Sequence, residues 1–209
     1  MPVAVPDTTS AEAIDLYPAG RKVAGGEGPA WREVRASILA LPRETGVFTM
    51  PATAEPLIVL VTSGEAEAQE RENDGPWLKS RLHAGSLYIT AAGAPYDFQV
   101  KTLGAEPFEV LTVLLSLPLF NEALADVFGA NAEFARLRDV SGFDDPLLVS
   151  LLQKLREELA RPTASAVFVR GIGQALAVHL ARNYTALTEG ARGESAALPG
   201  FKLRRITDW

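Results

Sequence analysis

The residues that could hold a metal ion or act as nucleophiles are few in this chain. It has two histidines, His83 and His179, and no cysteine. A protein metal site usually needs three or four nitrogen, sulfur or carboxylate ligands. No serine or threonine stands in the kind of sharp turn that exposes a catalytic nucleophile. The pattern therefore predicts no metal, no cofactor and no catalytic residue.

Two other segments have a composition that could do chemistry. GIGQAL at 171–176 has two of the three glycines of a dinucleotide-binding turn, but no strand precedes it. Its glycines therefore indicate close packing of a helix. The acidic run EAEAQEREN at 65–73 could pair carboxylates for acid–base work. Charges that alternate with Ala66 and Ala68 are more typical of one solvent-exposed face of a hairpin.

Aromatic and thioether side chains give a stronger indication of a site. Small-molecule sites are mostly apolar with a few placed polar groups, and Tyr and Trp combine a large ring with a hydrogen-bonding group. The residues predicted to bind a ligand are Trp31, Met50, Trp77, Tyr88, Tyr96 and Phe98. The alternative is that these side chains simply fill the interior. Lys79 and Arg81 could receive an anionic ligand or face solvent.

Most of these side chains lie on segments with the pattern of short β-strands. In GSLYITAAGAPY at 85–96, a glycine turn precedes a β-branched and aromatic run, and a small-residue corner with a proline follows. About eight such segments with turns between them predict a barrel or sandwich. They span 31–41, 46–50, 56–64, 65–72, 77–82, 85–90, 96–102 and 107–116.

The hydrophobic period changes to 3.6 residues after the last of these strands. A short helix is expected over 118–128, and two longer helices over 145–160 and 165–187. Asp145 is suited to be an N-cap and Pro146 to the first helical position. Two or three helices beside a barrel leave apolar stripes uncovered, which favours a symmetric dimer. The predicted dimer-interface residues are Leu148, Leu151, Leu152, Leu155, Ile172, Leu176 and Leu180.

Composition excludes some classes of function. The 20 basic and 26 acidic residues give a formal net charge of −6, so this chain alone should bind nucleic acid poorly. The absence of cysteine fits a reducing compartment. The sequence shows no signal peptide and no apolar run long enough for a membrane span. A cytoplasmic protein without a membrane partner is expected.

The order of these pieces resembles the N-terminal regulatory region of AraC-type transcriptional regulators. The resemblance covers nearly the whole chain and rests on Trp31, GSLYITAAGAP, the helix pair from Asp145 to Leu187 and the closing LPGFKLRRITDW. It implies an α+β fold in four parts. These are an arm over 1–30, a cupin-like β-barrel or jelly roll over 31–116, an antiparallel helical dimerisation region over 117–189, and a linker with the start of an absent helix-turn-helix domain over 190–209.

Many cupins bind a metal, and this chain departs from their second metal motif. Gly85 and Gly93 fit that motif, but Ala91 stands where a proline is usual and Tyr96 where a histidine is usual. The resemblance therefore implies a homodimer whose metal-free barrel binds a small-molecule effector, with DNA contacted only through the missing C-terminal domain.

Two alternatives to this regulatory reading remain. One is a cupin-like enzyme that acts on a small metabolite, which bound metal together with turnover would favour. The other is a barrel that has lost ligand binding and serves as a dimerisation platform, which a solidly packed interior would favour.

Overall fold

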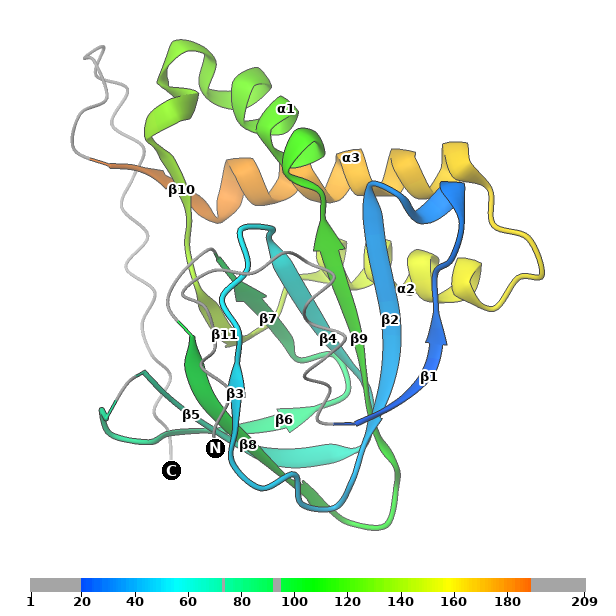
Figure 1. Cartoon of the computed structure of the whole chain (residues 1–209), viewed down its shortest axis with the longest axis vertical. Coiled ribbons are helices and arrows are strands. Elements are labelled where there is room, and N and C mark those ends of the chain that lie inside the picture. Colours follow the sequence, from blue (N-terminus) through cyan, green and yellow to red (C-terminus); the bar gives the residue numbers. More distant parts are fainter. Residues whose placement is uncertain (1–19, 73, 92–94, 189–209) are drawn as a thin grey trace, which may run out of the picture.

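The computed structural model describes residues 20–72, 74–91 and 95–188. Two antiparallel sheets face each other, and three helices pack along one of them (Figure 1). The six-stranded sheet has the order β1 (Arg21–Gly25), β2 (Val34–Leu41), β9 (Phe108–Leu115), β4 (Leu57–Ser63), β7 (Leu87–Thr90) and β11 (Val140–Phe143). The four-stranded sheet has the order β3 (Phe48–Met50), β8 (Tyr96–Leu103), β5 (Glu65–Glu72) and β6 (Leu78–His83).

The remaining elements follow the barrel or connect its parts. They are η2 (Pro29–Trp31), α1 (Leu117–Phe128), η3 (Gly129–Phe134), β10 (Ala135–Leu137), α2 (Pro146–Leu159), α3 (Ala166–Asn183) and β12 (Thr185–Leu187). The predicted α+β class is confirmed. Within the described part of the chain, no helix is long and apolar enough to cross a membrane.

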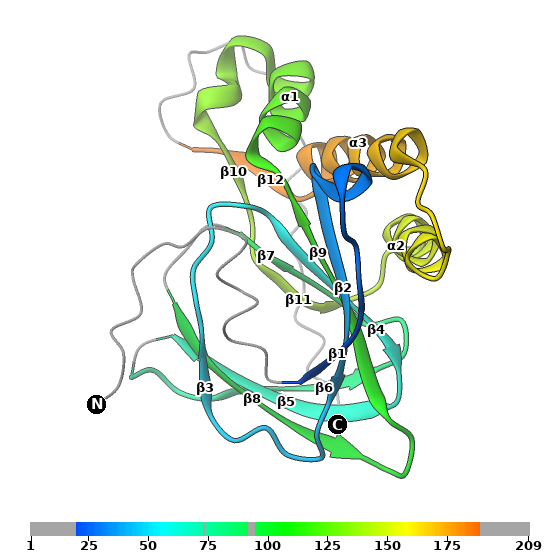
Figure 2. The same cartoon turned by 45° about the vertical axis from the view of Figure 1, so that its right-hand side comes forward.

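The main hydrophobic core lies between the six-stranded sheet and the helices (Figure 2). Successive side chains of a strand point to opposite faces. In β2 this sends Val34 and Ala36 toward the helices, where they are buried in the main core, while Ser37 and Leu39 face the space between the two sheets. One sheet therefore supplies both the packing surface for the helices and a wall of the barrel interior.

The helices begin as the sequence indicates. The carboxylate of Asp145 accepts hydrogen bonds from the backbone N–H groups of Leu147 and Leu148 at the start of α2. The hydroxyl of Ser165 accepts a hydrogen bond from the backbone N–H of Phe168 at the start of α3. Each side chain satisfies a donor that the helix itself leaves unpaired.

The structure buries most of the predicted dimer-interface residues within a single chain. The apolar stripes of α2 and α3 pack on the sheet and on each other, so they are already covered within one chain. Six of the seven predicted residues are buried there, namely Leu148, Leu152, Leu155, Ile172, Leu176 and Leu180, and Leu151 is half-buried. A second copy could contact only the outward faces of these helices.

Three elements differ from the sequence prediction. β1 lies inside the segment expected to be a loose arm and pairs with β2. The helix expected over 165–187 ends at Asn183, because the chain then extends as β12 to pair with β10. Between α1 and α2 the chain returns to the barrel as β11, beside β7. The predicted linker at 190–209 lies outside the described residues, as does the arm before residue 20.

The two glycines of α3 give a prediction about packing. A Cβ on Gly173 would stand 2.5 Å from Cγ2 of the buried Val34 and 3.0 Å from Cδ2 of Leu119, whereas a Cβ on Gly171 would meet nothing within 4 Å. Gly173→Ala is therefore expected to destabilise the fold by roughly 1–3 kcal/mol through overpacking. Gly171→Ala is expected to stabilise it by up to about 1 kcal/mol through helix propensity. Urea unfolding of both variants measures the contrast, and equal shifts would contradict the packing of α3 on β2.

Candidate ligand-binding cavity

The space between the two sheets contains a cavity of about 540 Å³. This is within the usual range for small-molecule sites, roughly 300–1,000 Å³. Its walls include Ser37, Leu39, Leu41, Phe48, Met50, Leu57, Val59, Glu70, Arg71, Glu72, Leu78, Tyr88, Ile89, Thr90, Tyr96, Phe98, Val110, Thr112, Asp139 and Ser141. Within the described segments, the interior is not solidly packed as it would be in a barrel that had lost ligand binding.

The cavity occupies one end of the barrel because a second core fills the other end. In that core Leu82, Val100 and Phe108 pack with Ala66 and Ala68 of β5 and close the space between the sheets. Toward the open end, the inward positions of β2 and β9 carry smaller polar side chains such as Ser37 and Thr112.

Four of the six residues predicted to bind a ligand lie on the cavity wall. Met50 comes from β3, Tyr96 and Phe98 from β8, and Tyr88 from β7 on the opposite sheet. The rings of Tyr96 and Phe98 meet edge to face, with their centroids 6.3 Å apart, and Phe48 meets Phe98 in the same way at 5.6 Å. These contacts form an aromatic wall on the four-stranded sheet.

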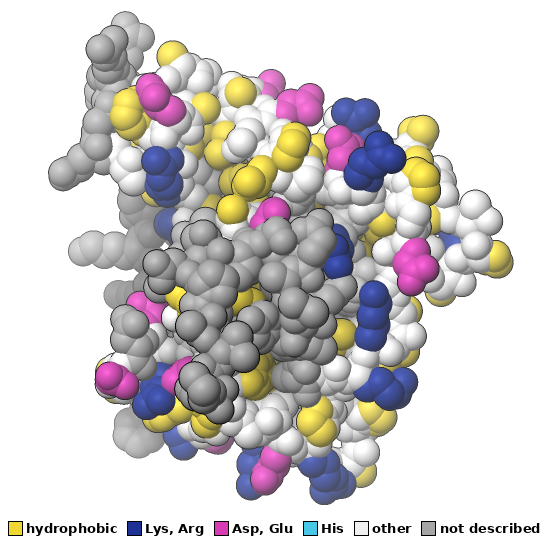
Figure 3. All heavy atoms as spheres, in the orientation of Figure 1, with side chains coloured by type: hydrophobic (Ala, Val, Ile, Leu, Met, Phe, Trp, Pro, Cys, Tyr) yellow, Lys and Arg dark blue, Asp and Glu magenta, His cyan; other side chains and the backbone are white. Residues whose placement is uncertain are grey.

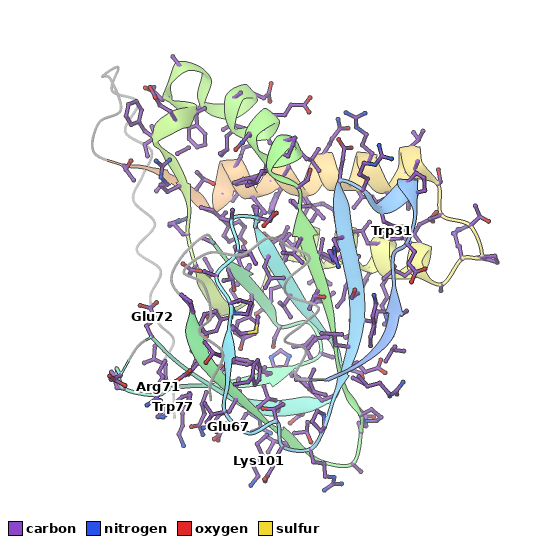
Figure 4. All side chains as sticks on the ribbon, in the orientation of Figure 1. Trp31, Glu67, Arg71, Glu72, Trp77 and Lys101 are labelled. Carbon is purple, nitrogen blue, oxygen red and sulfur yellow. The ribbon has the colours of Figure 1, made fainter. Side chains whose placement is uncertain are left out.

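The two tryptophans of the prediction do not line the cavity. Trp31 lies in η2, is buried in the main core and packs beside α3. Trp77 follows the β5–β6 turn and stacks on Arg71, whose Cζ lies 4.7 Å from the ring centroid. Figure 4 shows the two rings on opposite sides of the molecule. Alternation alone could not place either ring, because neither residue lies in a regular strand.

A polar end of the cavity was missed by the sequence analysis. Glu70 from β5 lies there with its Oε1 accepting a hydrogen bond from Ser141 Oγ at 3.2 Å. Asp139 also lines the cavity, and its Oδ1 accepts the Ala91 N–H at 2.8 Å. Ser141 and Asp139 are about 70 residues further along the chain than Glu70, so no local pattern predicts their meeting.

Burial affects the ionisation of Glu70 and of the two tyrosines. Loss of solvent raises the pKa of Glu70, and the neighbouring charges of Asp139 and Glu72 raise it further. The hydrogen bond from Ser141 acts in the opposite direction but does not cancel the rise. Burial also raises the pKa of Tyr88 and of Tyr96 to about 12. Both hydroxyls therefore stay protonated at neutral pH, and Tyr88 shares a 3.0 Å hydrogen bond with Ser80.

The basic residues of the hairpin lie on its outer face. Arg81 is 2.8 Å from Glu65, and Lys79 is 3.6 Å from Glu67. Both Lys79 and Arg81 are exposed, so the structure does not place them where an anionic ligand in the cavity could reach them. Figure 3 shows basic and acidic side chains side by side along the lower rim of the molecule.

The two histidines lie apart from the cavity. His83 is exposed and its Nδ1 lies 3.0 Å from the Ala84 carbonyl oxygen. His179 lies in α3 with Nε2 2.7 Å from Oδ2 of Asp145. Among the described residues, no three His, Cys, Asp or Glu side chains come together as a metal site.

Comparisons with known proteins bear on the fold. No known family pattern matches the sequence, and no curated protein matches it. The structure is similar to ToxT from Vibrio cholerae O395 bound to (E)-4-(8-methylnaphthalen-1-yl)but-3-enoic acid, with a TM-score of 0.52 and 9% identity over 73% of this chain and 58% of ToxT. It is also similar to wild-type ToxT from V. cholerae strain SCE256 with an unsaturated fatty acid bound, with a TM-score of 0.51 and 11% identity over 76% of this chain and 57% of ToxT.

A further solved structure is that of the AraC-like transcriptional activator CuxR, with a TM-score of 0.48 and 11% identity over 81% of this chain and 58% of CuxR. The chain spans less than two thirds of the length of ToxT and of CuxR. At these identities the likeness concerns the fold alone. This chain has a cupin-like sandwich followed by three helices, and in this it resembles the N-terminal region of the AraC-family regulator ToxT.

Proposed function

We propose that this chain is the ligand-sensing and dimerisation region of an AraC-type transcriptional regulator, with a small-molecule effector bound in a metal-free barrel. The observation that carries the proposal is the 540 Å³ cavity, which has an aromatic wall and a few converging polar groups. The similarity in fold to ToxT, which has been solved with a fatty acid and with a synthetic organic acid bound, supports it. DNA would be contacted through a further domain.

The proposal includes dimerisation through the outward faces of the helices. Near the start of α3, Val167 is 85% exposed and Phe168 is 43% exposed. Leu147 is 50% exposed at the start of α2, which lies at the opposite end of this antiparallel helix pair. Large apolar side chains gathered on a surface often mark a protein interface. A symmetric contact between two copies through the start of α3 would cover Val167 and Phe168.

Two substitutions are expected to separate effector binding from dimerisation. Tyr96→Ala removes an aromatic ring from the cavity wall and should weaken effector binding about tenfold or more, while the dimer stays intact. Val167→Glu places a charge on the outward face of α3 and should dissociate the dimer while binding persists. Compounds that raise the Tm in a metabolite library serve as ligands for calorimetry, and analytical ultracentrifugation reports the dimer.

Three results would contradict the proposal. Loss of the dimer in Tyr96→Ala would mean that the cavity is not the effector site. A library that contains no stabilising compound would contradict effector binding itself. Bound metal together with turnover of a metabolite would favour the cupin-like enzyme.

A further inference from the structure

The two faces of strand β5 carry opposite electrostatic environments. Because side chains alternate along a strand, Glu70 and Glu72 share the inward face with Ala66 and Ala68, which are buried in the second core. Both glutamates line the cavity. The other acidic residues of the strand, Glu65 and Glu67, point to the outer face and have basic partners there.

The cavity itself holds an excess of negative charge. Its described lining residues include three carboxylates, those of Glu70, Glu72 and Asp139, and the structure pairs none of them with a Lys or Arg side chain of the described segments. The one basic residue among these lining residues is Arg71.

The guanidinium of Arg71 is already engaged on the outer face of β5. Its Nε and Nη2 donate to Oδ2 of Asp97 at 3.0 and 2.9 Å, and Trp77 stacks on it. An anionic ligand would have to break this arrangement and enter beside three carboxylates. Figure 4 shows Arg71, Glu72 and Trp77 together at the turn of the hairpin.

Aromatic rings lie beside the same carboxylates. Phe98 is the direct cross-strand neighbour of Glu70, and Tyr96 is that of Glu72. Tyr88 belongs to the facing sheet, and the charge of Glu70 reaches both tyrosine hydroxyls. The faces of aromatic rings attract cations, and the attraction is stronger when the cation is desolvated. Carboxylates and rings together form a site suited to an ammonium group.

We infer that the effector is an organic cation, an ammonium group on an apolar body, whose charge is held by Glu70 with Asp139 and Glu72 and whose body lies along Tyr88, Tyr96 and Phe98. The inference rests on the proposed effector-binding function and names the class of ligand. It sets this chain apart from ToxT, which has been solved with a carboxylic acid and with a fatty acid bound. Apolar contacts along Leu39, Val59 and Val110 favour a body of aryl or alkyl groups.

Three matched probes test the charge preference on the whole 209-residue chain. Phenylbutylamine, phenylbutanol and phenylbutyrate each carry a phenyl ring on a four-carbon chain and differ in the charge at the end of that chain; in the acid the fourth carbon is the carboxyl carbon. By titration calorimetry the amine is expected to bind at least about tenfold more tightly than the alcohol, which follows from an ion pair with the partly buried Glu70 and a cation–π contact. The carboxylate is expected to bind more weakly than the alcohol.

A pair of substitutions on one strand serves as variant and control. Glu70→Gln keeps the size of the side chain and an oxygen for Ser141, and should weaken amine binding about tenfold or more while the alcohol binds unchanged. Glu67→Gln, three residues away on the outer face, should leave both affinities unchanged. Circular dichroism verifies that each variant is folded. Glu72→Gln removes a second inward charge and should also weaken binding of the amine.

The outcomes separate this inference from the function on which it rests. The inference of a cationic effector would be overturned if phenylbutyrate bound as tightly as the amine, or if Glu70→Gln left amine binding unchanged. The chain would then be a sensor for another class of ligand. Library hits that are all acids or neutral molecules would do the same. Failure of all three probes together with every library compound would overturn effector binding itself.

Discussion

Phenylbutylamine binding is expected to weaken about tenfold for each pH unit once acidity protonates Glu70 in the empty cavity. Burial raises the pKa of Glu70, and a bound ammonium ion would lower it again. Between these two values the ligand competes with one proton, which gives a slope of about one decade per pH unit. The ammonium group itself stays charged throughout, since alkylamines have a pKa of about 10.

The sign of this dependence follows from the groups that face Glu70. Asp139 and Glu72 oppose its ionisation, Ser141 donates to it, and Tyr88 and Tyr96 remain neutral. Affinity is therefore present above the raised pKa of Glu70 and is lost as the pH falls through it. Calorimetry from about pH 8 to pH 4 measures the slope.

The variant Glu70→Gln is the control for the pH experiment. Its weaker affinity should show less pH dependence than that of the wild-type chain, because the titrating carboxyl is gone. Burial disfavours the charged form of Glu70. Without ligand, the Glu70→Gln variant should therefore have the same Tm as the wild-type chain or a higher one. An unchanged pH profile in Glu70→Gln would assign the dependence to another group.

The inward position of Glu70 and Glu72 could have been predicted from the sequence by extending the alternation of side chains along the strand. The run 65–72 was correctly predicted as a strand, with Ala66 and Ala68 on its covered face. The same period of two places Glu70 and Glu72 on that face, yet all the charges of the run were assigned to the one solvent-exposed face of a hairpin. The partners of Glu70 could not be foreseen, because β11 reaches the sheet after a helix and its pairing with β7 depends on the fold of the whole barrel.

The helices show a different limit of sequence reasoning. A leucine stripe predicts that one face of a helix is buried, but it does not predict the surface that buries it. In α2 the stripe at Leu148, Leu152 and Leu155 packs within its own chain, where a partner subunit was expected. The strand β1 escaped prediction for a related reason. RKVAG has little apolar content of its own and forms a strand because it pairs with β2.

Asp145→Ala is expected to lower the free energy of unfolding by about 3 kcal/mol, the largest stability loss that we predict for a polar residue. Its Oδ1 accepts two backbone N–H groups of α2, and its Oδ2 accepts the Tyr184 hydroxyl and His179 Nε2, each at 2.7 Å. One carboxylate thus joins the start of α2 to the end of α3. Losing the cap costs about 1 kcal/mol, and unpairing two part-buried groups accounts for the remainder.

The adjacent Asp144 provides the matched control, because it is exposed and precedes the cap without a hydrogen bond among those of the described side chains. Asp144→Ala should change stability by less than about 0.5 kcal/mol. Asp145→Ala should lower the Tm by about 6–12 °C, since 1 kcal/mol moves the Tm of a chain of this size by about 2–4 °C. Equal melting of the two variants would show that the carboxylate does not hold the helix pair together.

The contribution of Asp145 should also depend on pH. Burial alone would raise the pKa of Asp145, but hydrogen bonds from Leu148 N–H, Tyr184 and His179 outweigh it and hold that pKa below its ordinary value. A lowered pKa stabilises the fold at pH values above the ordinary aspartate pKa, and this stabilisation is lost as the pH falls through the lowered value. The stability difference between the wild-type chain and Asp145→Ala should therefore shrink in acid. A difference that stays constant from neutral pH down to acid unfolding would mean that the helices are joined by packing rather than by this charge.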